Sequence, residues 1–147
     1  MRGSLTAAGE FSSASPRVGV AAIVVRDGRV LLGRRISASH GGGTWQFPGG
    51  HLEPFEEVEA CAAREVEEET GLALRNLRRG PWTNDRFAAE RRHYVTLFVL
   101  ADAPHGVPEV REPEKCAEWR WFAWDEMPEP LFLPIVNLRL QGWRPPA

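Results

Sequence analysis

Apolar residues near the start of the chain fall into two short stretches that are separated by a tight turn. Val18 to Val25 is apolar and rich in β-branched residues, which is typical of a buried strand. Asp27-Gly28 is a turn dipeptide, and the sequence returns with the apolar stretch Arg29 to Arg34. The pattern predicts a β-hairpin over these residues.

The hydrophobic period then changes to three and four residues, from about Glu56 to Thr70. This segment holds good helix formers and neither Pro nor Gly. Pro54 suits the first turn of a helix, and Gly71 sits where a left-handed C-terminal cap is common. One face of the predicted helix is apolar or small and should pack on a core. Its members are Val58, Cys61, Ala62 and Val66.

The rest of the chain continues this mixture of strands and helices. Ser37 to Gly43 is interpreted as a glycine-rich connection, since the Gly-Lys-Ser/Thr of a phosphate loop does not follow it. Arg91 to Leu100 is apolar on both faces and is therefore predicted to be a central strand. We expect further strands at Thr44 to Phe47, Leu72 to Leu77 and Glu118 to Trp124, a loop at Pro104 to Glu114 and a helix at Leu131 to Leu140. The order predicts an α/β (α+β) sandwich.

Three carboxylates share one face of the central helix by their spacing. Glu65, Glu68 and Glu69 are three or four residues apart, and they lie near the helix C-terminus, where negative charge is unfavourable. Such an arrangement calls for a compensating cation, and oxygen ligands favour Mg2+ or Mn2+. Arg64 is within helical reach of Glu68 and can fold toward Glu56, so it is expected to orient the carboxylates.

A charge run of this kind is more often a solvated helix face, and Glu67-Glu68-Glu69 alone would be interpreted in that way. The complete spacing favours a functional site. From Gly50 to Leu72 the chain follows G-x5-E-x7-R-E-U-x-E-E-x-G-U, where U is a bulky aliphatic residue, and every fixed position is filled. This pattern matches the Nudix box, and the chain resembles a Nudix hydrolase.

The resemblance implies the Nudix fold, a mixed β-sheet sandwiched between helices, and Mg2+-dependent (or Mn2+-dependent) hydrolysis of a nucleoside diphosphate linked to a further group. It implies that Glu65 and Glu69 bind metal, that Glu68 binds metal or serves as the base, and that the Gly49 carbonyl is a backbone ligand. The box itself comprises Gly50, Glu56, Arg64, Glu65, Glu68, Glu69 and Gly71.

Flanking segments indicate one branch of this family. The segments "LLGRR", "PGGHLE", "HYVT" and "EPEKCAEWRWFAWDEMPEPLF" resemble MutT-like nucleotide triphosphate diphosphatases, among them enzymes for thiopurine nucleotides, dihydroneopterin triphosphate and oxidised dGTP. Cleavage to a nucleoside monophosphate and pyrophosphate is the implied reaction, and a homodimer is the implied assembly. The alternatives are ADP-ribose, sugar nucleotides, dihydroneopterin triphosphate or prenyl diphosphates. A non-enzymatic nucleotide-binding module is less expected, because every box carboxylate is present.

Substrate contacts are predicted outside the carboxylates. Arg34 or Arg35 is a candidate phosphate contact, the alternative being a solvated strand end, and His51 is a candidate substrate contact beside the glycine pair. By resemblance, the start of the last helix lines a base pocket, here with Phe132, Leu133 and Ile135, although some relatives carry Trp at the position of Leu133. We expect His93 in the core, and Trp119, Trp121 and Trp124 mostly there too, with base stacking as the alternative.

Composition sets the remaining limits. The chain has 147 residues and a formal net charge of -2, which indicates one domain and gives no electrostatic case for duplex nucleic acid. No apolar run is long enough for a membrane span. Cys61 and Cys116 form no disulfide framework, so a cytoplasmic location is expected. Residues 1–15 are interpreted as a flexible or vector-derived tail, and residues 16–147 as the domain.

Overall fold

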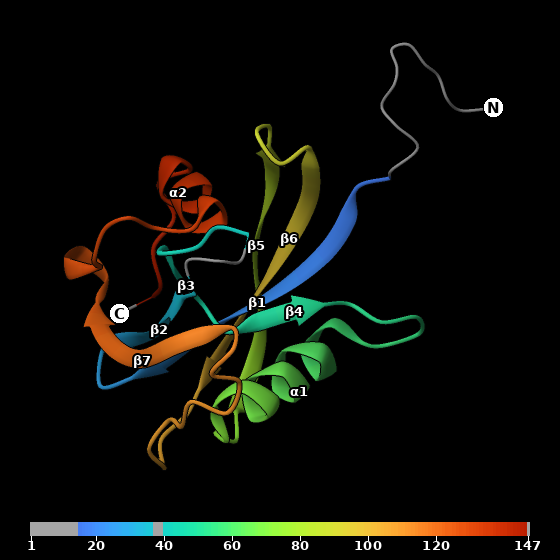
Figure 1. Cartoon of the computed structure of the whole chain (residues 1–147). Helices are drawn as coiled ribbons and strands as arrows, with labels where there is room; N and C mark the ends of the chain where they lie inside the picture. Colours follow the sequence, from blue (N-terminus) through green and yellow to red (C-terminus); the bar gives the residue numbers. More distant parts are fainter. Residues whose placement is uncertain (1–14, 37–39, 147) are drawn as a thin grey trace, which may run out of the picture.

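A mixed β-sheet forms the centre of the molecule (Figure 1). The computed structural model describes residues 15–36 and 40–146, so nearly all of the predicted tail lies outside the described residues. The strands are β1 (Arg17–Arg26), β2 (Arg29–Arg35), β3 (Trp45–Gln46), β4 (Gly49–His51), β5 (Arg75–Phe87), β6 (Arg92–Asp102) and β7 (Cys116–Ala123). The helices are α1 (Val58–Thr70), the short 3-10 helix η1 (Trp124–Glu126) and α2 (Leu133–Leu140).

Strand β1 organises the sheet. It runs parallel to β6, in a register that pairs Arg17 with Tyr94 and Val25 with Asp102. Along its first half it also pairs antiparallel with β4, and at its end it turns into the hairpin with β2. The described strands follow the order β3-β2-β1-β6-β5, with β4 on β1 and β7 on β2. The predicted hairpin and the central position of β6 are confirmed.

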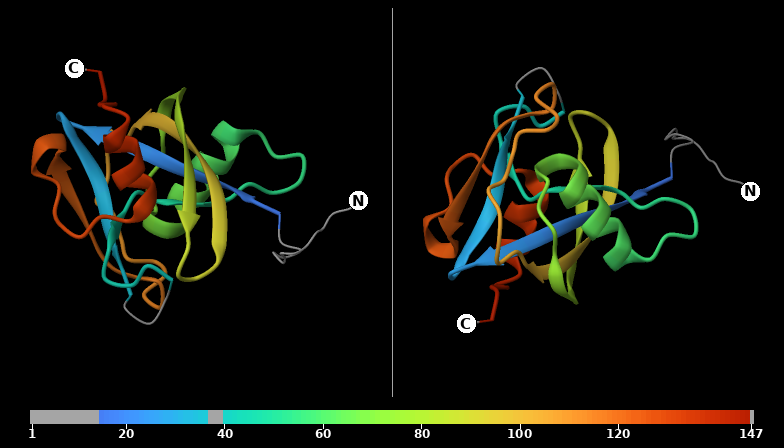
Figure 2. Two further views of the ribbon diagram at one scale, coloured as in Figure 1. Left: turned by 90° about the horizontal axis from the view of Figure 1, so that it is seen from above. Right: turned by 90° about the horizontal axis from the view of Figure 1, so that it is seen from below.

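The two helices cover opposite faces of this sheet (Figure 2). Alternation along β1 explains the division: Val20, Ala22 and Val24 pack in the cluster with α1, whereas Ile23 packs in the cluster with α2. On α1 the buried residues are Cys61, Ala62, Val66 and Thr70, which are spaced at helical steps. The predicted sandwich of a mixed sheet between helices is thus confirmed.

The C-terminus of α1 is capped as the sequence predicts. Gly71 adopts a φ of 79°, in the left-handed region, and its N–H donates to the carbonyl oxygen of Glu67. Arg111, from the loop before β7, also donates from Nη1 to the same carbonyl at 3.2 Å. A cation at this end of a helix is favourable, because it offsets the partial negative charge of the terminal carbonyls.

Two strands differ from the expectation. The strand predicted at 72–77 begins later and continues to Phe87 through Gly80 and Pro81, because register shifts between β5 and β6 absorb these residues. The glycine pair at 49–50, which follows the strand expected at Thr44 to Phe47, belongs to a separate strand, β4. There the lack of a side chain is required: a Cβ on Gly49 would lie 2.2 Å from the Val20 carbonyl oxygen.

Four further residues, His93 and three tryptophans, were expected wholly or mostly in the core. His93 is exposed and contacts Asn84, so the prediction of a core histidine was wrong. It lies near the start of β6, where the first residues of the strand are exposed, whereas Val99, at the same alternation, is buried. Trp119 is buried, whereas Trp121 and Trp124 are half-buried. In the described ranges, 15–36 and 40–146, no helix has both the length and the apolar character that crossing a membrane requires.

Candidate active site

Arg64 lies at the centre of the acidic face of α1. Its guanidinium donates from Nε and Nη2 to both oxygens of Glu56, at 2.8 and 3.0 Å. Its Nη1 donates to Glu65 at 3.0 Å and reaches Glu68 at 3.4 Å. Hydrogen bonding from Arg64 lowers the pKa of Glu56 to about 2. The contacts have the geometry expected of a residue that orients carboxylates.

Glu65 and Glu69 approach the glycine pair of β4. The Gly49 N–H lies 3.4 Å from Glu69 Oε1, and a Cβ on Gly50 would lie 2.3 Å from the Glu65 carboxyl carbon. Glycine is therefore what lets the helix set its carboxylates against the strand. Burial raises the pKa of the Glu69 carboxyl, and the neighbouring Glu65 raises it further by hydrogen bonding and by its charge.

One more carboxylate contributes to this field, and sequence reasoning did not select it. Glu112 comes from the loop between β6 and β7, and its charge also raises the pKa of Glu69. The same loop is fixed on α1 by backbone hydrogen bonds from Glu109 to Thr70 and from Arg111 to Glu69. No spacing rule connects Glu112 to the box, because the loop comes close only after folding.

These carboxylates fit a hard divalent cation by their chemistry. Within the described part of the chain, no three His, Cys, Asp or Glu side chains already converge as metal ligands. Arg64 holds Glu65 and Glu68 through one nitrogen, while Glu65 and Glu69 are adjacent and partly buried. Two adjacent carboxylates in such a place favour an oxygen-binding cation. The Gly49 carbonyl remains a predicted ligand.

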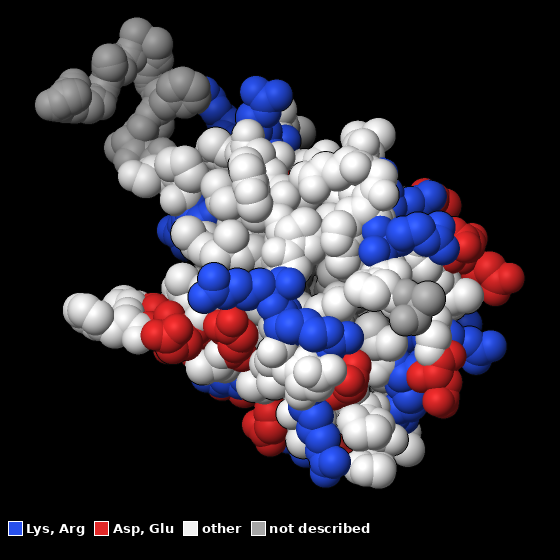
Figure 3. Space-filling view, turned by 180° about the vertical axis from the view of Figure 1, so that it is seen from behind, with Lys and Arg blue, Asp and Glu red and all other residues white. Residues whose placement is uncertain are grey.

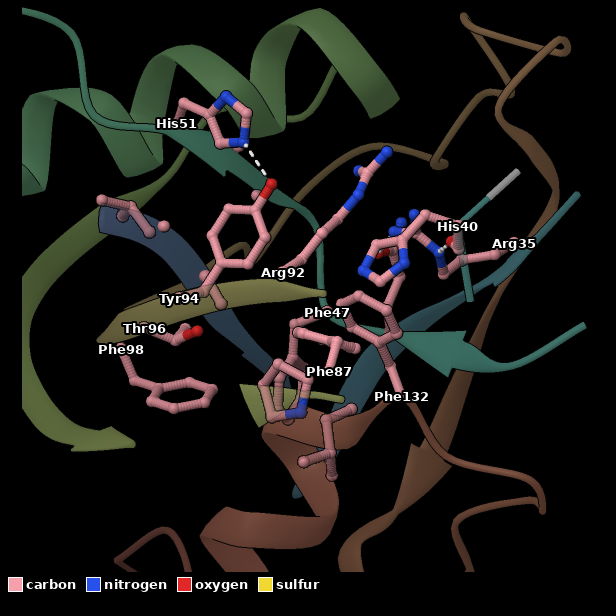
Figure 4. A pocket seen from close by; sticks show the side chains of 18 residues that line it. Arg35, His40, Phe47, His51, Phe87, Arg92, Tyr94, Thr96, Phe98 and Phe132 are labelled. Atoms are coloured by element: carbon pink, nitrogen blue, oxygen red, sulfur yellow. Dashed lines mark hydrogen bonds between the residues drawn. The ribbon is translucent and has the colours of Figure 1, made fainter. Parts of the chain in front are cut away.

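A cavity of about 300 Å³ lies on the other side of β4 (Figure 4). Its wall is largely aromatic and aliphatic, and polar groups are concentrated in a few side chains. The residues that line it are Gly19, Val20, Ala21, Arg35, His40, Gln46, Phe47, Gly49, Gly50, His51, Phe87, Arg92, Tyr94, Thr96, Phe98, Phe132, Pro134 and Ile135. This volume and lining suit a small flat ring with a polar edge.

The two candidate arginines have different surroundings. Arg35 lines the cavity, lies 4.3 Å from the ring centre of Phe132, and donates to the His40 carbonyl at 2.6 Å. Burial lowers the pKa of its guanidinium. Arg34 is exposed and forms an ion pair of 2.9 Å with Glu118, outside the cavity. Arg34 therefore matches the solvated strand end that was the alternative for the pair.

Of the other residues predicted to contact the substrate, some line the cavity and one does not. His51 lines the cavity, and its Nε2 lies 3.3 Å from the Tyr94 hydroxyl. Phe132 and Ile135 line it, whereas Leu133 does not, so the role predicted for Leu133 is not supported by this cavity. Consecutive residues at the start of a helix point in directions about 100° apart. The Leu133 side chain therefore does not share the direction of Phe132.

The hairpin of β5 and β6 supplies lining residues that sequence reasoning missed. Tyr94, Thr96 and Phe98 alternate along β6 and all line the cavity, together with Phe87 and Arg92 near the turn. Their period of two was a usable signal for a shared face. The direction of that face depended on the parallel pairing with β1, which no local pattern encodes.

Charges outside the cavity are mixed in sign. Figure 3 shows arginine and lysine side chains next to acidic ones over one face of the molecule, without one broad field of either sign. Glu118, for example, binds both Arg34 and Arg120 at 2.9 Å. Exposed pairs of this kind contribute little to stability, about 0–1 kcal/mol each.

Comparison with known proteins agrees with this geometry. Residues 15–138 match the model of the NUDIX domain. CTP pyrophosphohydrolase of Escherichia coli is 45% identical over 117 residues, which are 80% of this chain and 81% of that protein. The MutT NUDIX hydrolase of Burkholderia pseudomallei has a similar crystal structure, with a TM-score of 0.78 and 38% identity over 86% of this chain and 98% of that one.

A longer relative comes from Mycobacterium tuberculosis and is provisionally named 8-oxo-dGTP diphosphatase 3. It is 36% identical over 136 residues, which are 87% of this chain but 61% of the relative. The chain thus spans about three fifths of that protein. In this chain, residues 15–138, which match the family model, include the acidic helix, the glycine pair and the residues that line the cavity.

Proposed function

Because the chain belongs to the Nudix family, we propose that it is a Mg2+-dependent (or Mn2+-dependent) pyrophosphohydrolase that converts nucleoside triphosphates, including oxidised or modified ones, to nucleoside monophosphate and pyrophosphate. One observation carries the proposal: β4 has the paired carboxylates Glu65 and Glu69 on one border and the ring-sized cavity on the other. A substrate with a flat base and a phosphate chain matches both.

The acidic side of the site is assigned to the phosphates. A divalent ion, when bound, would neutralise phosphate charge and lower the pKa of a water molecule. Glu65 and Glu69 would hold such an ion, and Arg64 keeps Glu65 and Glu68 at fixed positions beside it. Glu68, whose side chain is 46% exposed, or Glu69 would accept the proton of the attacking water.

The cavity side is assigned to the base. Phe87, Phe98 and Phe132 offer aromatic surface, and Arg35 lies at the rim between the cavity and the loop after β2. An apolar wall favours any flat ring by burying area, about 25 cal/mol per Å². Shape alone separates similar ligands by only about 1–3 kcal/mol. We therefore expect activity on several nucleotides.

Product analysis tests the reaction class. A nucleoside triphosphate incubated with the chain and Mg2+ should give the monophosphate and pyrophosphate, and a chelator should stop turnover until Mg2+ is restored. Inorganic phosphate as the primary product would contradict the proposal. A parallel screen with ADP-ribose, sugar nucleotides, dihydroneopterin triphosphate and prenyl diphosphates would show whether another diphosphate is preferred, and binding without turnover would indicate a binding module.

Location and assembly complete the proposal. Cys61 and Cys116 are buried free thiols, and burial raises the pKa of Cys61 to about 12. Unreactive reduced thiols are consistent with the cytoplasmic location proposed here. The homodimer implied by the family resemblance is proposed as the assembly, and sedimentation of the purified chain would test it.

A further inference from the structure

His40 occupies an unusual position among the residues that line the cavity (Figure 4). Its ring packs edge-on against Phe87, with 4.4 Å between ring centres, and against Phe132, at 5.7 Å. Its carbonyl oxygen accepts a hydrogen bond from Arg35 Nε, which fixes its backbone. Its side chain is 11% exposed. Ring packing and the hydrogen bond to its backbone carbonyl thus fix the position of the imidazole.

The nitrogens of this ring, in contrast, have no hydrogen-bond partner. Both are inaccessible to solvent and unpaired among the described residues. The nearest carboxylate, Glu90, lies 3.7 Å from Nδ1, which is longer than a hydrogen bond. Buried polar atoms are nearly always paired in folded proteins, because leaving one unpaired destabilises the protein. Two ring nitrogens without a hydrogen-bond partner at a cavity wall indicate that a bound ligand supplies the partner.

Several other polar side chains that line the cavity already have hydrogen-bond partners. Arg35 donates to the His40 carbonyl and to Gln46, the Thr96 hydroxyl donates to the buried Asp85, and the Tyr94 hydroxyl contacts His51. Burial, followed by the charges of Arg35 and Arg92, lowers the pKa of His40, although the nearby Glu90 acts in the opposite direction. A neutral imidazole carries one donor and one acceptor. His40 therefore offers both hydrogen-bonding roles within a largely apolar wall.

We propose that His40 is a specificity-determining residue, and that a nitrogen of its ring binds the polar edge of the substrate's flat ring. This inference rests on the proposed function, because it takes the ring to be that of a nucleotide whose phosphates lie at the carboxylates. It favours heterocycles with a donor or acceptor at the edge over hydrocarbon chains of similar volume. A ligand without such an edge leaves both nitrogens unpaired, as they are in the free protein.

His40→Phe tests this role because phenylalanine keeps a ring against Phe87 and Phe132 and removes only the nitrogens. We expect kcat/KM for nucleoside triphosphates to fall about tenfold or more, mainly through KM. Hydrolysis of inorganic tripolyphosphate, which has no ring, should be unchanged. His93→Phe is the matched control, since His93 is exposed on β6 and does not line the cavity; it should leave both activities unchanged.

Thermal unfolding separates this role from a structural one. If the nitrogens serve a ligand, His40→Phe should leave Tm unchanged or raise it, because two unpaired buried atoms are lost. If His40 instead acts by pairing with Glu90, then His40→Phe and Glu90→Gln should lower Tm alike, and the proposal is overturned. His40→Gln, which restores a donor and an acceptor, should recover part of the nucleotide activity.

The two proposals fail in different ways. A wild-type protein that hydrolyses no nucleoside triphosphate would contradict the proposed function. A wild-type protein that does so, together with a His40→Phe variant whose kcat/KM is unchanged for every nucleoside triphosphate, would contradict the role of His40 alone. In that case the apolar wall and Arg35 would select the ring without this histidine.

Discussion

The acidic helix face and the aromatic cavity border the same strand, yet they are built in opposite ways. Arg64 and the carboxylates of α1 lie within a few turns of one helix, and their contacts are ion pairs. The cavity is assembled from β1, β4, the β5–β6 hairpin, the loop after β2 and the start of α2. Its contacts are mainly ring packing, for example between Phe87 and Phe132 at 5.3 Å.

This contrast shows why reaction class and substrate choice differ in how easily they are predicted. Carboxylates for a cation can be placed by helical spacing, so a short pattern encodes them. A ring-binding cavity depends on which strands become neighbours, so its members are scattered through the chain. We therefore expect the acidic helix face and the cavity to respond separately to mutation.

The largest effect is expected at Glu69. Glu69→Gln should lower kcat by at least about 100-fold, because a carboxylate at the phosphate end is lost. Folding should be preserved, and Tm should stay unchanged or rise, because the repulsion from Glu65 is relieved. Steady-state kinetics with Mg2+ and a thermal melt measure both. Glu67→Gln, an exposed residue on the same helix, is the control, and a loss below tenfold at Glu69 would argue against the metal-site interpretation.

Substitutions at the two glycines of β4 should have different effects, one on the stability of the fold and the other on kcat. A Cβ on Gly49 would meet the backbone of β1 at 2.2 Å, which cannot move cheaply, so Gly49→Ala should destabilise the fold by about 1–3 kcal/mol or more. A Cβ on Gly50 would meet the end of the flexible Glu65 side chain at 2.3 Å. Gly50→Ala should therefore keep Tm within a few degrees and lower kcat by about tenfold. Equal effects of the two variants in both assays would contradict this division.

On the cavity side, Phe132→Ala should raise KM for nucleoside triphosphates by about tenfold with kcat little changed, because the wall binds ground and transition states alike. Leu133→Ala is the comparison variant, because Leu133 does not line the cavity. Steady-state kinetics on the same substrates should show KM unchanged for Leu133→Ala. A larger KM effect at Leu133 than at Phe132 would support the role predicted for Leu133.

The smallest effect is expected at Glu56, and it depends on pH. The pKa of this carboxyl is lowered from 4.5 to about 2 by its hydrogen bond with Arg64. Its stabilisation is therefore complete above about pH 4.5 and is lost as the pH falls toward 2. Glu56→Gln should lower Tm slightly at neutral pH and reduce the difference between Tm at pH 6 and Tm at pH 3. An unchanged pH dependence would show that the ion pair does not stabilise the fold.

The sequence predicted the elements that depend on local pattern. The β1–β2 hairpin, the central β6 and the α1 helix with its Gly71 cap were all expected, because periodicity and capping act within a few residues. The extension of β5 through Pro81 and the glycine strand β4 were missed. Both run against strand propensity and persist because pairing with neighbouring strands outweighs it.

The same reasoning applies within the site. The box positions contact one another as expected, with Arg64 bound to Glu56 and Glu65. Glu112 and His40 were missed because each comes from a loop, and only the folded chain brings it to the site. Resemblance gives the segment that holds Leu133, whereas the direction of each side chain depends on where α2 begins.

The parallel pairing of β1 with β6 has a consequence for synthesis of the protein. Arg17 pairs with Tyr94, so the strand that begins the described chain waits for a partner that is made 77 residues later. The cavity wall waits longer still, because Phe132 and Ile135 follow Tyr94 in the chain. Chains grow from the N-terminus. A nascent chain therefore carries its acidic helix well before the cavity can form, because the cavity requires strands and a helix that are far apart in the sequence.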